Sequence, residues 1–151
     1  MEYPLHLVSS QPSTRLHGQL DNGAQSQNAK ICGREPISIN PYDAVERGIT
    51  SGDLVRVFND RGACLAGAVI TDGVMPGAVE LFTGAWYDPA ETKSGISLDS
   101  HGCVNVLTLD KGTSKLAQAP SSHTALVQVE IFKDEPPPVR AFLAPPTVEQ
   151  D

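Results

Sequence analysis

The chain has 151 residues, a length that suits one hydrophobic core and leaves no room for a second sizeable one. Its formal net charge of -7 argues against a general nucleic-acid-binding or anionic-membrane surface, because both partners attract clustered Lys and Arg. With 5% aromatic residues, 13 Gly and 12 Pro, the composition favours a loop-rich and strand-rich body over a helical bundle.

The first part of the chain predicts one strand followed by a polar loop. Residues 4–8 form a short apolar run that is typical of a strand. Residues 11–30 are rich in Gln, Asn, Ser and Gly, and so long a loop is uncommon in a compact domain unless it binds something or is disordered. The stretch 3–20 contains no acid but carries Arg15, so it is the best place in this chain for an anion.

A strand and a helix are predicted next. Residues 36–39 fit a strand, and Asn40 then offers a helix N-cap with Pro41 at the first helical position. Gly48 suits the C-terminal cap, so the helix should cover residues 41–47.

Two further strands should form a hairpin. The β-branched and aromatic run 54–58 predicts a strand, turn residues occupy 59–62, and residues 63–71 form a second strand whose small side chains suit a barrel interior. Residues 78–82 predict another strand after two Gly-containing turns.

The last part of the domain is predicted to be extended and then to become a tail. Residues 104–109 are expected to form a brief extended piece, and the alternation in 124–132 predicts a half-buried strand. A Pro-rich segment follows, so we expect a folded domain over residues 1–133 and an extended tail over 134–151. Short strands with one or two short helices favour a mainly β, closed barrel over a doubly wound sheet.

Motifs of common enzyme classes are absent from the sequence. It contains no GxSxG elbow, no P-loop and no GxGxxG after a strand. His101 and Cys103 are the only close His/Cys pair, and the paired spacing of a zinc site is missing. The cysteines Cys32, Cys64 and Cys103 have no CxxC spacing, which argues against a disulfide framework and mildly favours a reducing compartment. We predict neither a catalytic residue nor a metal ligand.

No apolar run is long enough to span a membrane, and the first residues are too polar for a signal peptide. We therefore expect that this stretch encodes neither membrane insertion nor export.

Two polar clusters could bind a ligand. The first follows the first strand and comprises Ser9, Ser10, Gln11, Arg15, His17 and Gln19. Gln has donors and an acceptor that match the edge of a pterin or purine, and Arg offers a fork for phosphate. Composition alone favours an ordinary solvated loop for this cluster. The second cluster comprises Asn105, Thr108, Thr113, Ser114, Lys115 and Gln118, and it too could be a surface loop.

Several other polar and aromatic residues are assigned structural roles. Because Asn105 lies between two valines, we expect its amide to be partly buried and to have a partner. Trp86 and Tyr87 are interpreted as packing residues. His6 and His123 have no supporting neighbours and are interpreted as structural.

The sequence resembles the C-terminal molybdopterin dinucleotide-binding domain of the DMSO reductase family, particularly of biotin sulfoxide and trimethylamine N-oxide reductases. The runs 4–12 and 15–19 resemble the opening of that domain. Further matches follow in order at 35–41, 44–48, 52–62, 84–87, 105–110 and 112–114. The matching is collinear from Pro4 to about Glu130, and the Pro-rich tail lies outside it.

The resemblance implies a six-stranded double-psi β-barrel that caps a molybdenum bis(molybdopterin guanine dinucleotide) cofactor. The remaining domains of the same polypeptide would share this cofactor. The implied cofactor-binding residues are Ser9, Ser10, Gln11, Arg15, His17, Gln19, Asn105, Ser114 and Lys115. Family chemistry is oxygen-atom transfer at molybdenum, whose protein ligand is usually a serine of another domain. The isolated chain is therefore expected to have no turnover and to lack the cofactor.

The first loop also indicates a branch of the family. Nitrate reductases and formate dehydrogenases carry a His-rich version of this loop, whereas Arg15 and Gln19 here favour reduction of S-oxides or N-oxides. Gly18 departs from the Ser of close relatives, which puts any side-chain contact at that position in doubt. The resemblance leaves the cytoplasm and the periplasm open, with the cytoplasm slightly favoured.

Two other functions compete with this one. A decarboxylase on the same barrel type makes its pyruvoyl group at a Gly-Ser bond, and this sequence has no Gly-Ser dipeptide. A stand-alone double-psi barrel could act as a protein-interaction adaptor, with the Pro-rich tail as its docking segment. The sequence leaves open the substrate, the electron donor and the oligomeric state.

Overall fold

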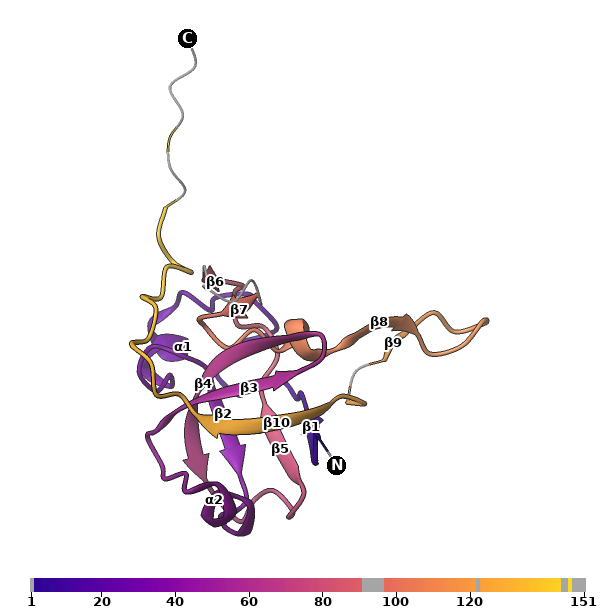
Figure 1. Ribbon diagram of the computed structural model, residues 1–151. Coiled ribbons are helices and arrows are strands. Elements are labelled where there is room, and N and C mark those ends of the chain that lie inside the picture. The colour runs from indigo at the N-terminus through magenta and orange to yellow at the C-terminus, as the bar shows by residue number, and fades with distance from the viewer. Residues whose placement is uncertain (1, 91–96, 122, 145–146, 148–151) are drawn as a thin grey trace.

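Six strands close into a ring at the centre of the molecule (Figure 1). A computed structural model describes residues 2–90, 97–121, 123–144 and 147. Neighbouring strands are hydrogen-bonded in the order β2, β5, β1, β10, β3 and β4, and a further pairing of β4 with β2 closes the ring. The strands are β1 (Leu5–Val8), β2 (Pro36–Ile39), β3 (Leu54–Asn59), β4 (Gly62–Ile70), β5 (Ala78–Leu81) and β10 (Leu126–Ile131).

Two of the ring's pairings are parallel and the other four are antiparallel. In the parallel pairs, β1 lies beside β5 with Leu7 opposite Val79, and β2 lies beside β4 with Ile37 opposite Ala68. The antiparallel pairs are β1–β10, β10–β3, β3–β4 and β2–β5. The predicted mainly β fold, a closed six-stranded barrel of the double-psi type, is confirmed, and each ring strand coincides with a predicted one within two residues at either end.

The core lies inside the ring and follows from alternation along the strands. Residues two apart on a strand share a face, so Val55 and Val57 of β3 and Val127 and Val129 of β10 are all buried. In β4, residues 62–68 are buried without alternation, because a second small cluster around Leu65 covers its other face.

Two short helices accompany the barrel. Helix α2 (Pro41–Arg47) has the predicted bounds, and its N-cap Asn40 accepts a hydrogen bond from the Tyr42 backbone at 2.9 Å. Helix α1 (Ala24–Asn28) corrects the expectation that residues 11–30 contain no regular element. No side chain caps α1, and its one buried residue, Ser26, is held by a tertiary bond to Asp21 at 2.9 Å. Helix α1 therefore lacks the two local signals that predict a helix, a capping side chain and a periodic apolar face.

Shorter elements lie beside the ring. β6 (Pro89–Ala90) and β7 (Leu98–Asp99) extend the sheet next to β4, and β8 (Leu109–Gly112) and β9 (Pro120–Ser121) form a hairpin that projects from the barrel (Figure 1).

The expected extended piece at 104–109 is wrong for its first four residues, which form the 3-10 helix η1 (Val104–Leu107). In such a helix residues three apart share a face, and Val104 and Leu107 are both buried.

Part of the Pro-rich segment lies against the barrel. The Arg34 guanidinium donates a hydrogen bond to the Pro137 carbonyl at 2.6 Å, and the Asp88 carboxylate accepts one from the backbone N–H of Arg140 at 2.5 Å. The domain boundary near Lys133 stays a prediction. Within the described ranges, no helix has both the length and the apolar character needed to cross a bilayer.

Candidate functional site: a neutral polar groove and its buried support

A groove of about 400 Å³ lies where β1 and β5 end, beside η1 and the base of the β8–β9 hairpin. Because β1 and β5 are parallel, the residues after Val8 and those after Leu81 leave the barrel side by side, and the Thr83 N–H donates to the Ser10 carbonyl at 2.9 Å. The groove is lined by Ser9, Ser10, Gln11, His17, Thr83, Asn105, Thr108, Leu109, Ser121 and His123. None of these lining residues is Asp, Glu, Lys or Arg, so the groove offers hydrogen-bonding groups and no fixed charge.

Gln11 fixes the orientation of the His17 imidazole. The amide oxygen of Gln11 accepts from the His17 backbone N–H at 2.9 Å, so its nitrogen is the group that lies 2.8 Å from His17 Nδ1. An amide nitrogen can only donate, so the nearer ring nitrogen, Nδ1, is an acceptor, and the same amide nitrogen lies 3.3 Å from His17 Nε2. Gln11 therefore holds the imidazole in place beside the groove.

His123 closes the groove from the C-terminal side. Its Nδ1 accepts a hydrogen bond from the Ser9 backbone N–H at 3.0 Å, which ties the turn after β9 to the end of β1. His17 and His123 both adopt left-handed backbone conformations, with φ of 48° and 58°. Such conformations cost energy in residues other than glycine and tend to occur at functional sites.

The structure brings together five of the nine predicted cofactor-binding residues. Ser9, Ser10, Gln11, His17 and Asn105 all line the groove. Asn105 is exposed there, which corrects the expectation of a partly buried amide. An exposed side chain in a groove is available to a ligand.

The other four predicted residues lie elsewhere, and their contacts with a cofactor remain a prediction. The side chain of Arg15 points into the protein and is 1% exposed. Gln19 is exposed and forms an isolated bridge with Leu16. Ser114 and Lys115 are exposed in the connection between β8 and β9, away from the groove lining.

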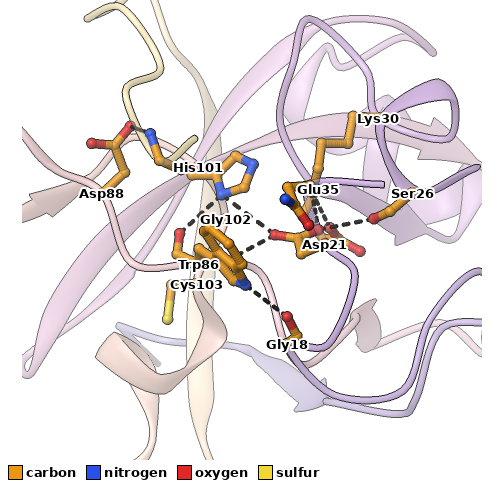
Figure 2. A network of polar contacts seen from close by, with 12 residues as sticks. Gly18, Asp21, Ser26, Lys30, Glu35, Trp86, Asp88, His101, Gly102 and Cys103 are labelled. Carbon is orange, nitrogen blue, oxygen red and sulfur yellow. Dashed lines mark hydrogen bonds and ion pairs between the residues drawn. The ribbon is translucent and has the colours of Figure 1, made fainter. Parts of the chain in front are cut away.

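Arg15 belongs to a buried quartet of charged residues, with Asp21, Lys30 and Glu35, in the connection from β1 to β2 (residues 9–35), which we call the groove loop. Its Nη2 lies 3.1 Å from Glu35 and its Nε 3.5 Å from Asp21. Lys30 Nζ lies 2.9 Å from a carboxylate oxygen of each of the same two acids (Figure 2). The cation of the acid-free stretch is thus neutralised by two acids that follow that stretch in the sequence. Two cations and two acids balance within the quartet, as buried charges require.

Further hydrogen bonds attach this quartet to its surroundings. Burial alone would raise the pKa of the Asp21 carboxyl, but Lys30 and the Trp86 backbone N–H hold it below its ordinary value. The Trp86 N–H donates to Asp21 at 3.0 Å, and the Trp86 carbonyl lies 2.9 Å from Nδ1 of the fully buried His101 (Figure 2). Burial, helped by the nearby Lys30 charge, lowers the pKa of His101.

The quartet also holds the backbone that shapes the groove. Arg15 donates to the carbonyls of His17 at 3.1 Å and Thr83 at 2.9 Å, and both of these residues line the groove. Gly84, at φ 92°, lies so close to the His17 carbonyl that a Cβ at residue 84 would overlap it. The role of Arg15 in this structure is therefore to fix the groove loop from behind.

Asp99 organises the turn that leads from β7 to η1. Its fully buried carboxylate accepts hydrogen bonds from the backbone N–H groups of Asp88 at 2.8 Å, Gly102 at 2.6 Å and Cys103 at 2.6 Å. A carboxylate that receives several backbone donors needs no side-chain cation. This turn positions both His101 and Asn105.

Five further groove residues lie outside the predicted cofactor-binding set: Thr83, Thr108, Leu109, Ser121 and His123. Only the parallel pairing of β1 with β5 brings Thr83 to the groove, and no local pattern encodes that pairing. Of these five residues, only Thr108 belongs to a polar cluster that the sequence indicates as a possible ligand site. The sequence indicates a structural role for His123, and in the structure its ring accepts a hydrogen bond from the Ser9 backbone N–H.

The surface carries a second depression on strands β3 and β10. This depression of about 350 Å³ is lined by residues of α2, β3, β10 and the segment 132–134, and within it Arg56 lies 3.4 Å from Glu130. Among the residues that the structure describes, no group of three or more His, Cys, Asp or Glu could hold a metal ion.

Residues 5–126 match the protein family described as "Molydopterin dinucleotide binding domain". The chain belongs to this family. The predicted resemblance is confirmed, and the matched residues run from the start of β1 to the first residue of β10, so they include five of the six ring strands in full.

The chain is also similar to much longer curated proteins. It is 49% identical over 144 residues to a dimethyl sulfoxide/trimethylamine N-oxide reductase of Cereibacter sphaeroides, a match covering 95% of this chain and 18% of the relative. It is 51% identical over 132 residues to trimethylamine-N-oxide reductase 1 of Escherichia coli K12, a match covering 87% of this chain and 16% of the relative. The chain therefore spans less than a fifth of the length of these relatives.

One solved structure shows the same fold at low sequence identity. Acetylene hydratase from Pelobacter acetylenicus superposes with a TM-score of 0.69 at 15% identity, over 87% of this chain and 19% of that one.

Proposed function

We propose that this chain is the cofactor-capping domain of a molybdenum oxidoreductase that reduces S-oxides or N-oxides, and that it has no turnover alone. Its groove would cover a molybdenum bis(molybdopterin guanine dinucleotide) cofactor shared with the remaining domains of a longer polypeptide. Family membership and two relatives whose names identify them as reductases of such oxides support this function. When bound, that cofactor supplies two-electron oxygen-atom transfer.

The observation that carries the proposal is the chemistry of the groove lining. Pterin and guanine rings are uncharged and present alternating donors and acceptors at their edges. The groove offers amides from Gln11 and Asn105, hydroxyls such as that of Ser9, and imidazoles from His17 and His123. A volume of about 400 Å³ is within the range typical of small-molecule sites. The residues present therefore fit a neutral heterocycle.

The groove fits the diphosphate part of the dinucleotide less well. No Lys or Arg belongs to its described lining, and the side chain of Arg15 is already engaged by two acids. We therefore assign binding and orientation of a ring system to this chain. The phosphate charges would be balanced by residues of the other domains.

The test compares cofactor content in the full polypeptide that carries this domain. Gln11→Ala and Asn105→Ala each remove a hydrogen-bonding group from the groove, worth roughly 0.5–1.5 kcal/mol, so binding should weaken by about two- to tenfold. Molybdenum and released guanine nucleotide are measured per polypeptide, and oxide reduction is measured per molybdenum. We expect content to fall and activity per molybdenum to stay near the parent value.

The control is Asn28→Ala, which removes an exposed amide from α1, outside the groove. Unchanged cofactor content with lost activity per molybdenum would contradict the assignment of these residues to binding. The 151-residue chain, expressed alone in a host that makes the cofactor, should contain no stoichiometric molybdenum. Robust oxide reduction by that chain would overturn the claim that it needs the other domains.

A further inference from the structure

The segment 137–142, which we call the C-terminal strap, is attached to the barrel at several points. Arg34 is only 5% exposed, and its guanidinium donates a hydrogen bond to the Pro137 carbonyl at 2.6 Å. The Asp88 carboxylate accepts from the backbone N–H of Arg140 at 2.5 Å and of Ala141 at 3.1 Å. These bonds fix the strap's backbone immediately before Phe142.

The side chain of Phe142 completes this attachment. Its ring meets the indole of Trp86 with centroids 5.4 Å apart and the imidazole of His101 with centroids 5.0 Å apart, both edge-on. Edge-to-face packing at these distances is favourable. Phe142 therefore joins two side chains that come from different loops.

The residues beneath Phe142 lead directly to the groove. Trp86 donates from its backbone to Asp21 of the buried quartet and from its indole to the Gly18 carbonyl at 2.7 Å (Figure 2). Gly18 follows His17, which lines the groove. Two consecutive contacts therefore connect the strap to the groove loop.

We propose that the C-terminal strap positions the groove loop, with Phe142 as its principal positioning residue. Phe142 fixes the place of Trp86, and Trp86 holds the loop at Gly18 and Asp21. Releasing the strap loosens residues 15–35 and with them the groove. The consequence for cofactor binding rests on the function proposed above, whereas the mechanical role of the strap does not.

The sequence provides an optical reporter for this role, because Trp86 is the chain's only tryptophan. In the 151-residue chain, Phe142→Ala should shift the Trp86 emission to longer wavelength and raise its acrylamide quenching constant by about twofold, because one covering ring is lost. Leu143→Ala is the matched control, since it truncates a neighbouring apolar side chain that is 69% exposed. Far-UV circular dichroism verifies that both variants are folded.

Hydrogen exchange measures the loop itself. Amides of residues 15–35 should exchange several-fold faster in Phe142→Ala than in Leu143→Ala, while those of β3 and β10 stay unchanged. A chain that ends at residue 136 is the second variant, and it should reproduce both effects. Unchanged quenching and unchanged exchange in Phe142→Ala and in this shorter chain would overturn the proposal.

The full polypeptide separates this inference from the proposed function. Phe142→Ala should lower molybdenum content per polypeptide, and parent-level content despite faster loop exchange would overturn the link from the strap to cofactor binding. If the strap variants alter Trp86 and the loop, while Gln11→Ala and Asn105→Ala leave cofactor content at the parent level, the function has failed and the mechanical role stands.

Discussion

His101 combines full burial with an incomplete set of hydrogen-bond partners. Its Nδ1 donates to the Trp86 carbonyl, so the neutral ring leaves Nε2 as an acceptor, and the described residues offer this atom no partner. Lys30, Asp21 and Asp99 are the charged groups that act on the ring. Burial and the Lys30 charge outweigh the two acids, so the pKa of His101 lies below its ordinary 6.5.

A histidine with a lowered pKa makes the fold sensitive to mild acid. Below pH 6.5 the His101 side chain is protonated in the unfolded chain but stays neutral in the folded chain. The folded state therefore has its full stability above pH 6.5 and loses stability as the pH falls toward the lowered pKa of His101. The free energy of unfolding should therefore decrease by up to about 1.4 kcal/mol per pH unit in this window. Urea titrations at successive pH values measure the slope.

The variant His101→Gln should show a flatter profile between pH 7 and 5, and the exposed His6→Gln should behave like the parent. A parent-like slope in His101→Gln would assign the acid sensitivity to another group. Asp21 belongs to a separate window, because its lowered pKa contributes stability that is lost only as pH falls below 3.8.

For single residues, the sequence predicted that polar, uncharged side chains would form the site better than it predicted where each side chain lies. Three of the five predicted residues that line the groove, Ser9, Ser10 and Gln11, directly follow the end of β1, a strand that local patterns predicted. Arg15 was correctly singled out as unusual, but its partners are Asp21, in a loop, and Glu35, the residue before β2. Spacing along the chain does not encode which charges meet in the interior.

The groove loop and the connection after β5 fit together through a glycine. Gly84 and Gly48 both have positive φ, at 92° and 65°, but only a Cβ at residue 84 would collide with another part of the chain. Gly48→Ala should therefore cost only the left-handed strain, about 1 kcal/mol. Gly84→Ala should cost roughly 1–3 kcal/mol more, because the His17 backbone must move.

Thermal and urea unfolding of the two variants measure this difference. Gly84→Ala should also change hydrogen exchange in the groove loop, which Gly48→Ala should leave unaltered. Equal losses of stability in the two variants would show that the His17 backbone can move away from residue 84 at little cost in free energy.

Elements with strong local signals could be predicted, and those that depend on tertiary contacts could not. Helix α2 has an N-cap, a proline and a C-terminal glycine, and its predicted bounds were right. Helix α1 lacks such signals, and η1 replaced a predicted extended segment because Val104 and Leu107 face the core. The two-residue strands β6 and β7 exist only through their pairing beside β4.

The buried quartet and the barrel should unfold as one unit. The Glu35 N–H donates to the His101 carbonyl at 3.0 Å, and the Glu35 carbonyl accepts from Gly67 of β4 at 3.0 Å, so one residue bridges the ring and the quartet. Trp86 fluorescence and far-UV circular dichroism should therefore report the same urea midpoint. A lower midpoint by fluorescence would show that the loops open before the barrel.

The closure of the ring dictates when this molecule can fold. β1, the first strand, is completed by β10, the last, through the pairing of His6 with Leu126. During synthesis the barrel therefore stays open until residues 126–131 have left the ribosome, and the edges of β1 and β3 that pair with β10 are free to pair wrongly until then. Such distant pairing makes folding slow. The nascent domain should be most prone to aggregation immediately before β10 emerges.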